Sequence, residues 1–142
     1  SGNYSILHHA FVCGPGRTTP IGTFRTPFKA AWHPLQGCWG QYCTQITGNY
    51  LFHSSPYNSP NKNDLSYRLY NQLGTVCSHG CVRLTVADAK WIYDNCPLGT
   101  TVSIYNASSL PVPKPSAPWL DISSPNRGWD PTDPDPANPW NK

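Results

Sequence analysis

Residues 77–88 read CSHGCVRLTVAD, a thiol-containing turn that runs directly into the start of a helix. Thr85 and Asp88 resemble a capping box, in which side-chain oxygens accept hydrogen bonds from the first backbone N–H groups of a helix. Apolar residues then recur on a helical spacing until Pro97, which cannot continue a helix. We therefore predict one clear short helix at about residues 86–95.

The rest of the chain has the composition of a mainly β protein. Charged residues are only 12% of the 142 residues, whereas 16 prolines and 11 glycines favour short strands joined by many turns. The length fits one domain with a core of its own. Alternating or β-branched stretches predict strands at residues 4–12, 22–26, 43–46, 50–53 and 101–105, with a polar loop over residues 54–65.

The two ends of the chain depart from this pattern. Residues 1–3, Ser-Gly-Asn, read as a turn before a strand, so we expect a parent protein to supply a preceding strand that pairs with residues 4–12. Residues 1–106 are predicted to form the folded domain. Residues 107–142 are rich in proline and predict an extended C-terminal arm. Tryptophans are expected to anchor this arm against the domain, namely Trp119, Trp129 and Trp140.

Charge and hydropathy argue against two classes of partner. The net charge is +3 and the basic residues are scattered, so the chain lacks the basic run of a nucleic-acid-binding surface. No stretch approaches the ~20 apolar residues that span a bilayer, and the N-terminus has no signal-peptide pattern. We expect any export signal or anchor to lie outside this sequence.

Six cysteines and no methionine suit either an oxidising compartment or a thiol-based site. If one thiol must stay free to react, at least one of the other five is also unpaired or pairs outside the chain. Cys38 with Cys43, and Cys13 with Cys96, are candidate disulfides that the sequence leaves open.

The segment around Cys81 has the chemistry of a nucleophile. A cysteine attacks as its thiolate, so it needs a nearby base or positive field. Gly80 permits a sharp bend, after which backbone N–H groups of residues 79–81 are able to converge on a developing oxyanion. The candidate bases are His53, at the end of a predicted strand, and His79, followed by the less specific His8, His9 and His33.

His53-Ser54, followed by residues 78–83 with the sequence SHGCVR, resembles the signature of the YkuD-type L,D-transpeptidases. Residues 19–24, TPIGTF, are similar to the upstream motif of that family. The resemblance extends from about Phe11 to Tyr105. It implies a β-sandwich of mixed strands with short helices.

The resemblance also implies roles for the motif residues. Cys81 is implied as the nucleophile, His53 as its base, and the carbonyl of Ser54 as the group that orients His53. The backbone around Gly80 is implied as the oxyanion hole. The other expected site residues are His79 as an accessory group, Arg83 and Ser78 as loop or substrate contacts, and Trp39 and Tyr42 in the substrate groove.

The family's reaction is an acyl transfer on peptidoglycan stem peptides. A donor tetrapeptide loses its terminal D-alanine to form a cysteine thioester, and the amine of an acceptor stem resolves the thioester into a 3→3 cross-link. The resemblance implies no metal or organic cofactor, carbapenems as inhibitors, and a secreted or membrane-anchored protein at the bacterial cell wall.

Other interpretations of the same residues stay open. Water in place of the amine would make the enzyme an L,D-carboxypeptidase or endopeptidase. A wall-binding module would keep the fold without catalysis. Cys77, His79 and Cys81 are also zinc-type ligands, although no second ligand pair accompanies them. The aromatic residues between the motifs, Trp32, Trp39 and Tyr42, are either groove or core residues.

Overall fold

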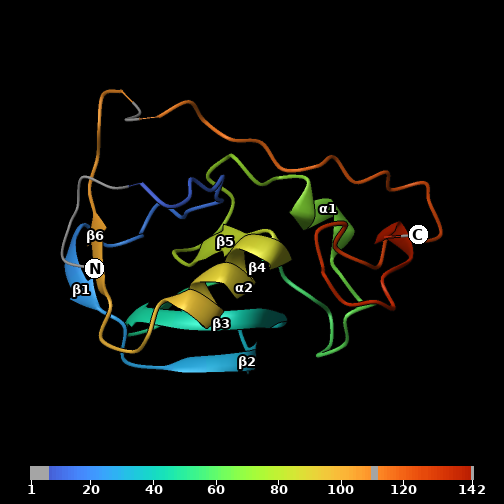
Figure 1. Ribbon diagram of the computed structural model, residues 1–142, viewed down its shortest axis with the longest axis horizontal. Helices are drawn as coiled ribbons and strands as arrows, with labels where there is room; N and C mark the ends of the chain where they lie inside the picture. The colour runs from blue at the N-terminus through green and yellow to red at the C-terminus, as the bar shows by residue number, and fades with distance from the viewer. Residues whose placement is uncertain (1–6, 110–111, 142) are drawn as a thin grey trace.

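A computed structural model describes residues 7–109 and 112–141. Its main sheet contains four strands in the order β2 (Lys29–Pro34), β3 (Trp39–Thr47), β4 (Tyr50–Ser54) and β5 (Val82–Leu84). The first two pairs are antiparallel, and β4 pairs with β5 in parallel. Figure 1 shows helix α2 (Val86–Asn95) lying over this sheet.

A second, two-stranded sheet joins β1 (Gly22–Arg25) and β6 (Thr101–Ile104) in antiparallel register. The remaining regular elements of the described chain are the four-residue helix α1 (Tyr67–Tyr70) and the 3-10 turn η1 (Pro139–Asn141). The prediction of a mainly β protein with mixed strands and one clear helix is confirmed.

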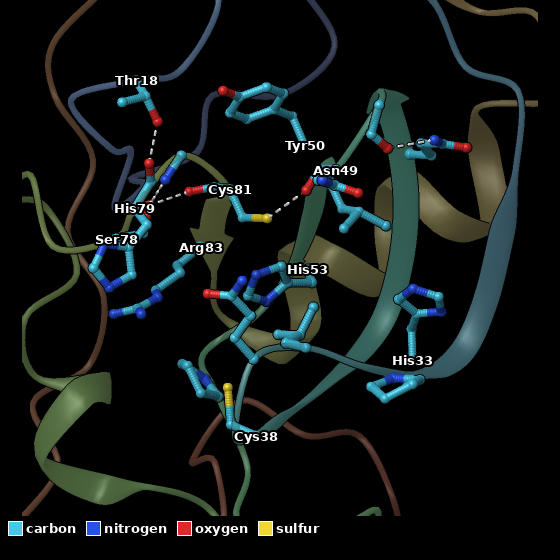
Figure 2. Close-up of a pocket in the computed structure, with 18 of the residues that line it drawn as sticks. Thr18, His33, Cys38, Asn49, Tyr50, His53, Ser78, His79, Cys81 and Arg83 are labelled. Atoms are coloured by element: carbon cyan, nitrogen blue, oxygen red, sulfur yellow. Dashed lines mark hydrogen bonds between the residues drawn. The ribbon is translucent and has the colours of Figure 1, made fainter.

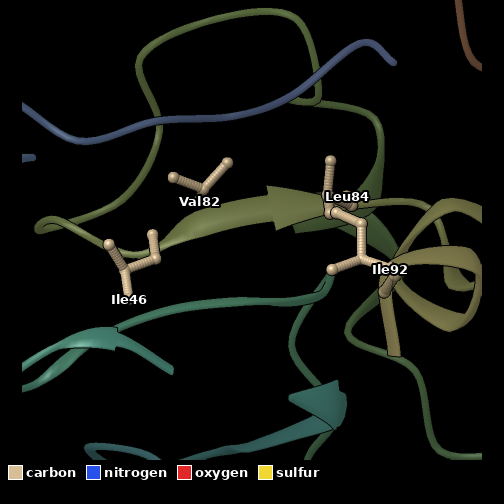
Figure 3. Close-up of a cluster of buried hydrophobic side chains, with 5 residues drawn as sticks. Ile46, Val82, Leu84 and Ile92 are labelled. Atoms are coloured by element: carbon tan, nitrogen blue, oxygen red, sulfur yellow. The ribbon is translucent and has the colours of Figure 1, made fainter. Parts of the chain in front are cut away.

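Helix α2 closes the main core over the sheet. Its buried residues Ala89 and Ile92 pack against Ile46 of β3 and against Val82 and Leu84 of β5. Figure 3 shows Ile46, Val82, Leu84 and Ile92 of this cluster. Side chains alternate between the two faces of a strand. Since Val82 and Leu84 face the helix, the residues next to them, 81 and 83, face the opposite side of the sheet.

The start of α2 is held from two directions. Thr85 is the N-cap and accepts a hydrogen bond from the Asp88 N–H at 3.2 Å, as the capping pattern predicts. The C-terminal arm supplies two more acceptors. Asp130 Oδ2 accepts the Val86 N–H at 3.0 Å, and Thr132 Oγ1 accepts the Ala87 N–H at 3.0 Å. The arm therefore completes the helix that follows β5.

The arm is anchored by Leu120, which is fully buried in a second cluster with Tyr57, Leu65, Tyr70 and Val86. Trp140 also packs on this cluster, and its indole N–H donates to the carbonyls of Asn126 and Trp129. The expected anchoring role of Trp119 is wrong, because this side chain is 78% exposed.

The structure overturns one strand prediction and adds two strands that were not predicted. Within the predicted strand 4–12, residues 7–12 form no strand, and residues 4–6 lie outside the described residues. Here His9 and Phe11 pack against the Trp91 ring rather than joining a ladder. Strands β2 and β5 were not expected. The first is a sheet edge without alternation, and the second is three residues long and depends on a distant partner.

We expect Leu120→Ala to lower the free energy of unfolding by about 2–5 kcal/mol, because it empties a filled site in the second cluster. Urea-induced unfolding measures the change. The neighbouring Trp119→Ala is the matched control and should change stability by less than about 0.5 kcal/mol, because its side chain is exposed. Equal effects of the two substitutions would contradict this account of the arm.

Candidate active site

The register of β4 with β5 brings the two motifs together. His53 pairs with Arg83, and Phe52 pairs with Val82, so Cys81 lies immediately before β5, next to Leu51. Cys81, Arg83, Leu51 and His53 all line one cavity of about 720 Å³ on the side of the sheet away from α2. Figure 2 shows Cys81, Arg83 and His53 around this cavity. The alternation of side chains along β4 and β5 therefore brings residues that are far apart in sequence onto the same face of the sheet.

His53 is set up as a neutral base. Its side chain is 1% exposed, and Nδ1 is hydrogen-bonded to the Ser54 carbonyl. A carbonyl only accepts, so Nδ1 carries the proton and Nε2 is left as an acceptor. Burial lowers the pKa of His53 to about 4, against an opposing contribution from the Ser54 carbonyl. The imidazole is therefore uncharged at neutral pH.

A glycine on β3 makes room for this histidine. A Cβ on Gly40 would lie 3.1 Å from the His53 Cβ and 2.9 Å from the Cys43 sulfur, which is closer than ordinary contact. The Ser54 hydroxyl accepts the Gln41 N–H at 2.9 Å and donates to the Ser55 carbonyl at 2.9 Å. The residue that orients His53 is thus itself fixed to the neighbouring strand.

Cys81 rests as a neutral thiol. Its sulfur donates to the Asn49 carbonyl at 3.3 Å, and no hydrogen bond of the described residues joins it to His53. Burial raises the pKa of the Cys81 thiol, while the Leu51 N–H and the Arg83 guanidinium act in the opposite direction. The resting pair is therefore a thiol and an imidazole, and the proton must move when the sulfur attacks.

The turn from Ser78 to Cys81 is stabilised by hydrogen bonds of the Ser78 hydroxyl. Ser78 Oγ donates to the Cys81 carbonyl at 2.5 Å and accepts the Gly80 N–H at 3.1 Å. A Cβ on Gly80 would lie 2.4 Å from the Tyr50 ring, so only glycine fits beneath that ring. The Gly80 N–H is thus engaged within the turn, whereas the Cys81 N–H takes part in no hydrogen bond of the described residues.

Arg83 organises the loop before the nucleophile. Its Nη1 donates to the Cys77 carbonyl at 2.7 Å, and its backbone pairs with Gly14 in both directions. Its guanidinium also gives the cavity a positive side chain. The cavity is lined by Arg83 and by His33, His53 and His79, with no aspartate or glutamate among its lining residues. A negatively charged ligand therefore meets no like charge there.

The structure brings together most of the predicted site residues. Cys81, His53, Gly80, Ser78, His79 and Arg83 line the cavity. Ser54 does not line it, but its carbonyl is hydrogen-bonded to His53. Trp39 and Tyr42, which were expected in the substrate groove, are not among the residues that line the cavity. They are half-buried and pack against the second hydrophobic cluster, as does Trp32, because their positions on the sheet face core residues.

Several cavity residues carried no signal in the sequence. Phe28, His33 and Cys38 come from β2 and its connections, and Asn49 and Tyr50 come from the turn into β4. Because β2 was not predicted, nothing placed its residues beside the motif. The position of Asn49 one residue before a predicted strand was the available hint that it lies near a site.

The cysteines do not form the candidate disulfides. All six thiols are free, including Cys13, Cys38, Cys43 and Cys96. Cys43 is buried, and this burial raises its pKa to about 12. Within the described residues, no three His, Cys, Asp or Glu side chains are grouped to hold a metal ion, so Cys77, His79 and Cys81 do not assemble the alternative zinc set. None of the described helices has the length and apolarity needed to cross a membrane.

The sequence and fold define a class of protein. Residues 3–104 match the YkuD family, described as the L,D-transpeptidase catalytic domain. The match covers most of the chain and includes both motifs that line the cavity. This chain belongs to the YkuD family of L,D-transpeptidase catalytic domains.

Individual relatives share sequence or fold with this chain. The chain is 39% identical over 93 residues to YciB of Bacillus subtilis (strain 168), whose name assigns it provisionally to the L,D-transpeptidases; the match covers 61% of this chain and 46% of YciB. L,D-transpeptidase 3 from Mycobacterium tuberculosis in complex with a faropenem-derived adduct is 21% identical, with a TM-score of 0.53 and coverage of 71% and 50% of the two chains. LdtMt1 in complex with imipenem is 21% identical, with a TM-score of 0.52 and coverage of 69% and 49%. The chain spans about half the length of these relatives.

We expect the pKa of His53 to be about 4 in solution, because burial penalises the charged imidazole. The imidazole accepts a proton only when neutral, so reactivity that depends on this base should be lost as pH falls through about 4. Titration of the His53 ring by NMR measures the midpoint, and acylation rates over the same pH range provide the functional reading. A midpoint near the ordinary value of ~6.5 would contradict the buried, neutral base.

Proposed function

We propose that this domain is a peptidoglycan L,D-transpeptidase that forms 3→3 cross-links through a thioester on Cys81. The proposal is carried by one observation: the two family motifs, separated in sequence, place a thiol and a neutral buried imidazole on one cavity. Family membership supports the reaction class. No aspartate or glutamate lines the cavity, which suits stem peptides because these carry negatively charged carboxylates.

In the first step, the Cys81 sulfur attacks the carbonyl between the third and fourth residues of a donor tetrapeptide. The thiol proton passes to Nε2 of His53, while Nδ1 keeps its bond to the Ser54 carbonyl. The carbonyl electrons move to oxygen, and this charge needs a backbone donor. Collapse breaks the peptide bond, and the amine of D-alanine leaves with the proton from His53.

In the second step, the amine of an acceptor stem attacks the thioester carbonyl. His53 takes a proton from that amine and returns it to the departing sulfur, so the enzyme regains its thiol. The new amide joins two stems. If water attacks instead, the same steps give a carboxylate, and the activity is that of an L,D-carboxypeptidase or endopeptidase.

The proposed location follows from the proposed substrate. Peptidoglycan lies outside the cytoplasmic membrane, so we place the domain on the outer face of a bacterium, either secreted or attached to the membrane. Its partners there are the donor and acceptor stems, and β-lactams of the carbapenem class are proposed inhibitors. The imipenem complex of LdtMt1 supports the choice of a carbapenem, and the faropenem-derived adduct of L,D-transpeptidase 3 from Mycobacterium tuberculosis supports the use of β-lactams in general.

We expect incubation with a carbapenem to add one drug-sized mass to the wild-type protein and none to Cys81→Ala. The β-lactam carbonyl stands in for the peptide carbonyl that the thiolate attacks. Intact-mass spectrometry under reducing conditions makes the measurement. Cys96→Ala, which removes a thiol at the end of α2, is the control and should keep the adduct. An adduct that persists in Cys81→Ala would contradict the assigned nucleophile.

A second measurement separates the possible activities. With a donor tetrapeptide and an acceptor stem, a transpeptidase yields a cross-linked dimer and free D-alanine, and both products should disappear in Cys81→Ala. Release of D-alanine without a dimer would replace transfer by hydrolysis. Peptidoglycan binding with neither product would leave a wall-binding module and overturn the enzymatic proposal.

A further inference from the structure

The loop from Gly16 to Thr19 lies directly behind the turn that carries the nucleophile, residues 78–81. The two segments meet at a parallel bridge between Gly16 and Ser78. They are so close that a Cβ on Gly16 would lie 2.2 Å from the Gly80 nitrogen. This backbone contact makes the loop a support for the turn, and a side chain at residue 16 would push the turn out of place.

Two threonine hydroxyls fix the turn to this support. Thr18 Oγ1 donates to the His79 carbonyl, a bond drawn in Figure 2. Thr19 Oγ1 donates to the Gly80 carbonyl at 2.7 Å and accepts the Gly16 N–H at 2.9 Å. Since the Thr19 hydroxyl both donates and accepts, its hydrogen has one favoured direction, toward the Gly80 oxygen.

The bond from Thr19 has a consequence on the other side of the peptide. A trans peptide unit is planar, and its C=O and N–H point in opposite directions. The Gly80 carbonyl and the Cys81 N–H belong to the same unit, so Thr19 sets the direction of the Cys81 N–H. In the preceding peptide unit, between His79 and Gly80, the Gly80 N–H already donates a hydrogen bond to Ser78 Oγ.

We infer that Thr19 is a positioning residue: its hydroxyl orients the Gly80–Cys81 peptide so that the Cys81 N–H donates to the oxyanion formed during attack. The inference rests on the proposed acyl transfer. In that step the sulfur forms a bond to the carbonyl carbon, the π electrons of the carbonyl move to its oxygen, and the Cys81 N–H donates to that oxygen. Thr19 itself touches neither the substrate nor the sulfur in this scheme.

The test compares Thr19→Val, which replaces the hydroxyl with a methyl group, with Thr19→Ser, which keeps it. The readout is acylation of Cys81 by a carbapenem, followed by intact mass over time and over carbapenem concentration. At saturation, Thr19→Val should acylate roughly 10- to 100-fold more slowly, while the half-saturating concentration changes less than about threefold. Thr19→Ser should stay within about threefold of the wild type in both.

Alkylation of the same thiol by iodoacetamide separates positioning from general disruption. The sulfur attacks a saturated carbon and iodide leaves, so no oxyanion forms and the Cys81 N–H has no part. Peptide mapping of Cys81 should give an alkylation rate for Thr19→Val within about twofold of the wild type. Thr23→Val, which changes an exposed threonine of β1, is the matched control and should leave both reactions unchanged.

The inference is overturned if Thr19→Val acylates at the wild-type rate, if alkylation slows as much as acylation, or if Thr19→Ser fails to restore the rate. If Thr19→Val does not fold, Thr19→Ala takes its place under the same criteria. A wild-type protein that is alkylated at Cys81 but never acylated would instead refute the proposed acyl transfer.

Discussion

The parallel pairing of β4 with β5 is the constraint on which the site depends. Three residue pairs join these strands, and one of them sets His53 opposite Arg83. A shift by one residue would turn Cys81 toward the helix and Val82 toward the cavity, because side chains alternate along a strand. Burial of Val82 and Leu84 beneath α2 opposes that shift. The hydrophobic core therefore fixes the register that places the thiol and the imidazole on one face.

Much of this arrangement could be predicted from local sequence. The cap at Thr85 and the stop before Pro97 gave the bounds of α2, and the short motifs gave the cysteine and the histidine. Pairing between distant segments could not be predicted in the same way. Strand β5 is three residues long and exists because β4 lies beside it, whereas residues 7–12 have strand-like composition and no ladder partner.

The cavity wall shows the same limit. His33 and Cys38 belong to an edge strand and its turn, and no local pattern links them to the motif. Conversely, Trp39 and Tyr42 lie close in sequence to cavity residues but are half-buried and pack against the second hydrophobic cluster. Which face a residue occupies depends on the register of the whole sheet. The positive φ of Tyr42, 53°, marks an irregularity in β3 that a simple alternation of faces does not predict.

The contact between Asp130 and the start of α2 has a consequence for how the chain folds during synthesis. Asp130 lies 44 residues after Val86, whose N–H it accepts. Because a ribosome releases the N-terminal part of a domain first, the sheet and helix emerge before the group that completes the helix start. The last steps of folding thus await the final part of the arm, and closing so long a loop adds an entropic cost that burial of Leu120 helps to offset.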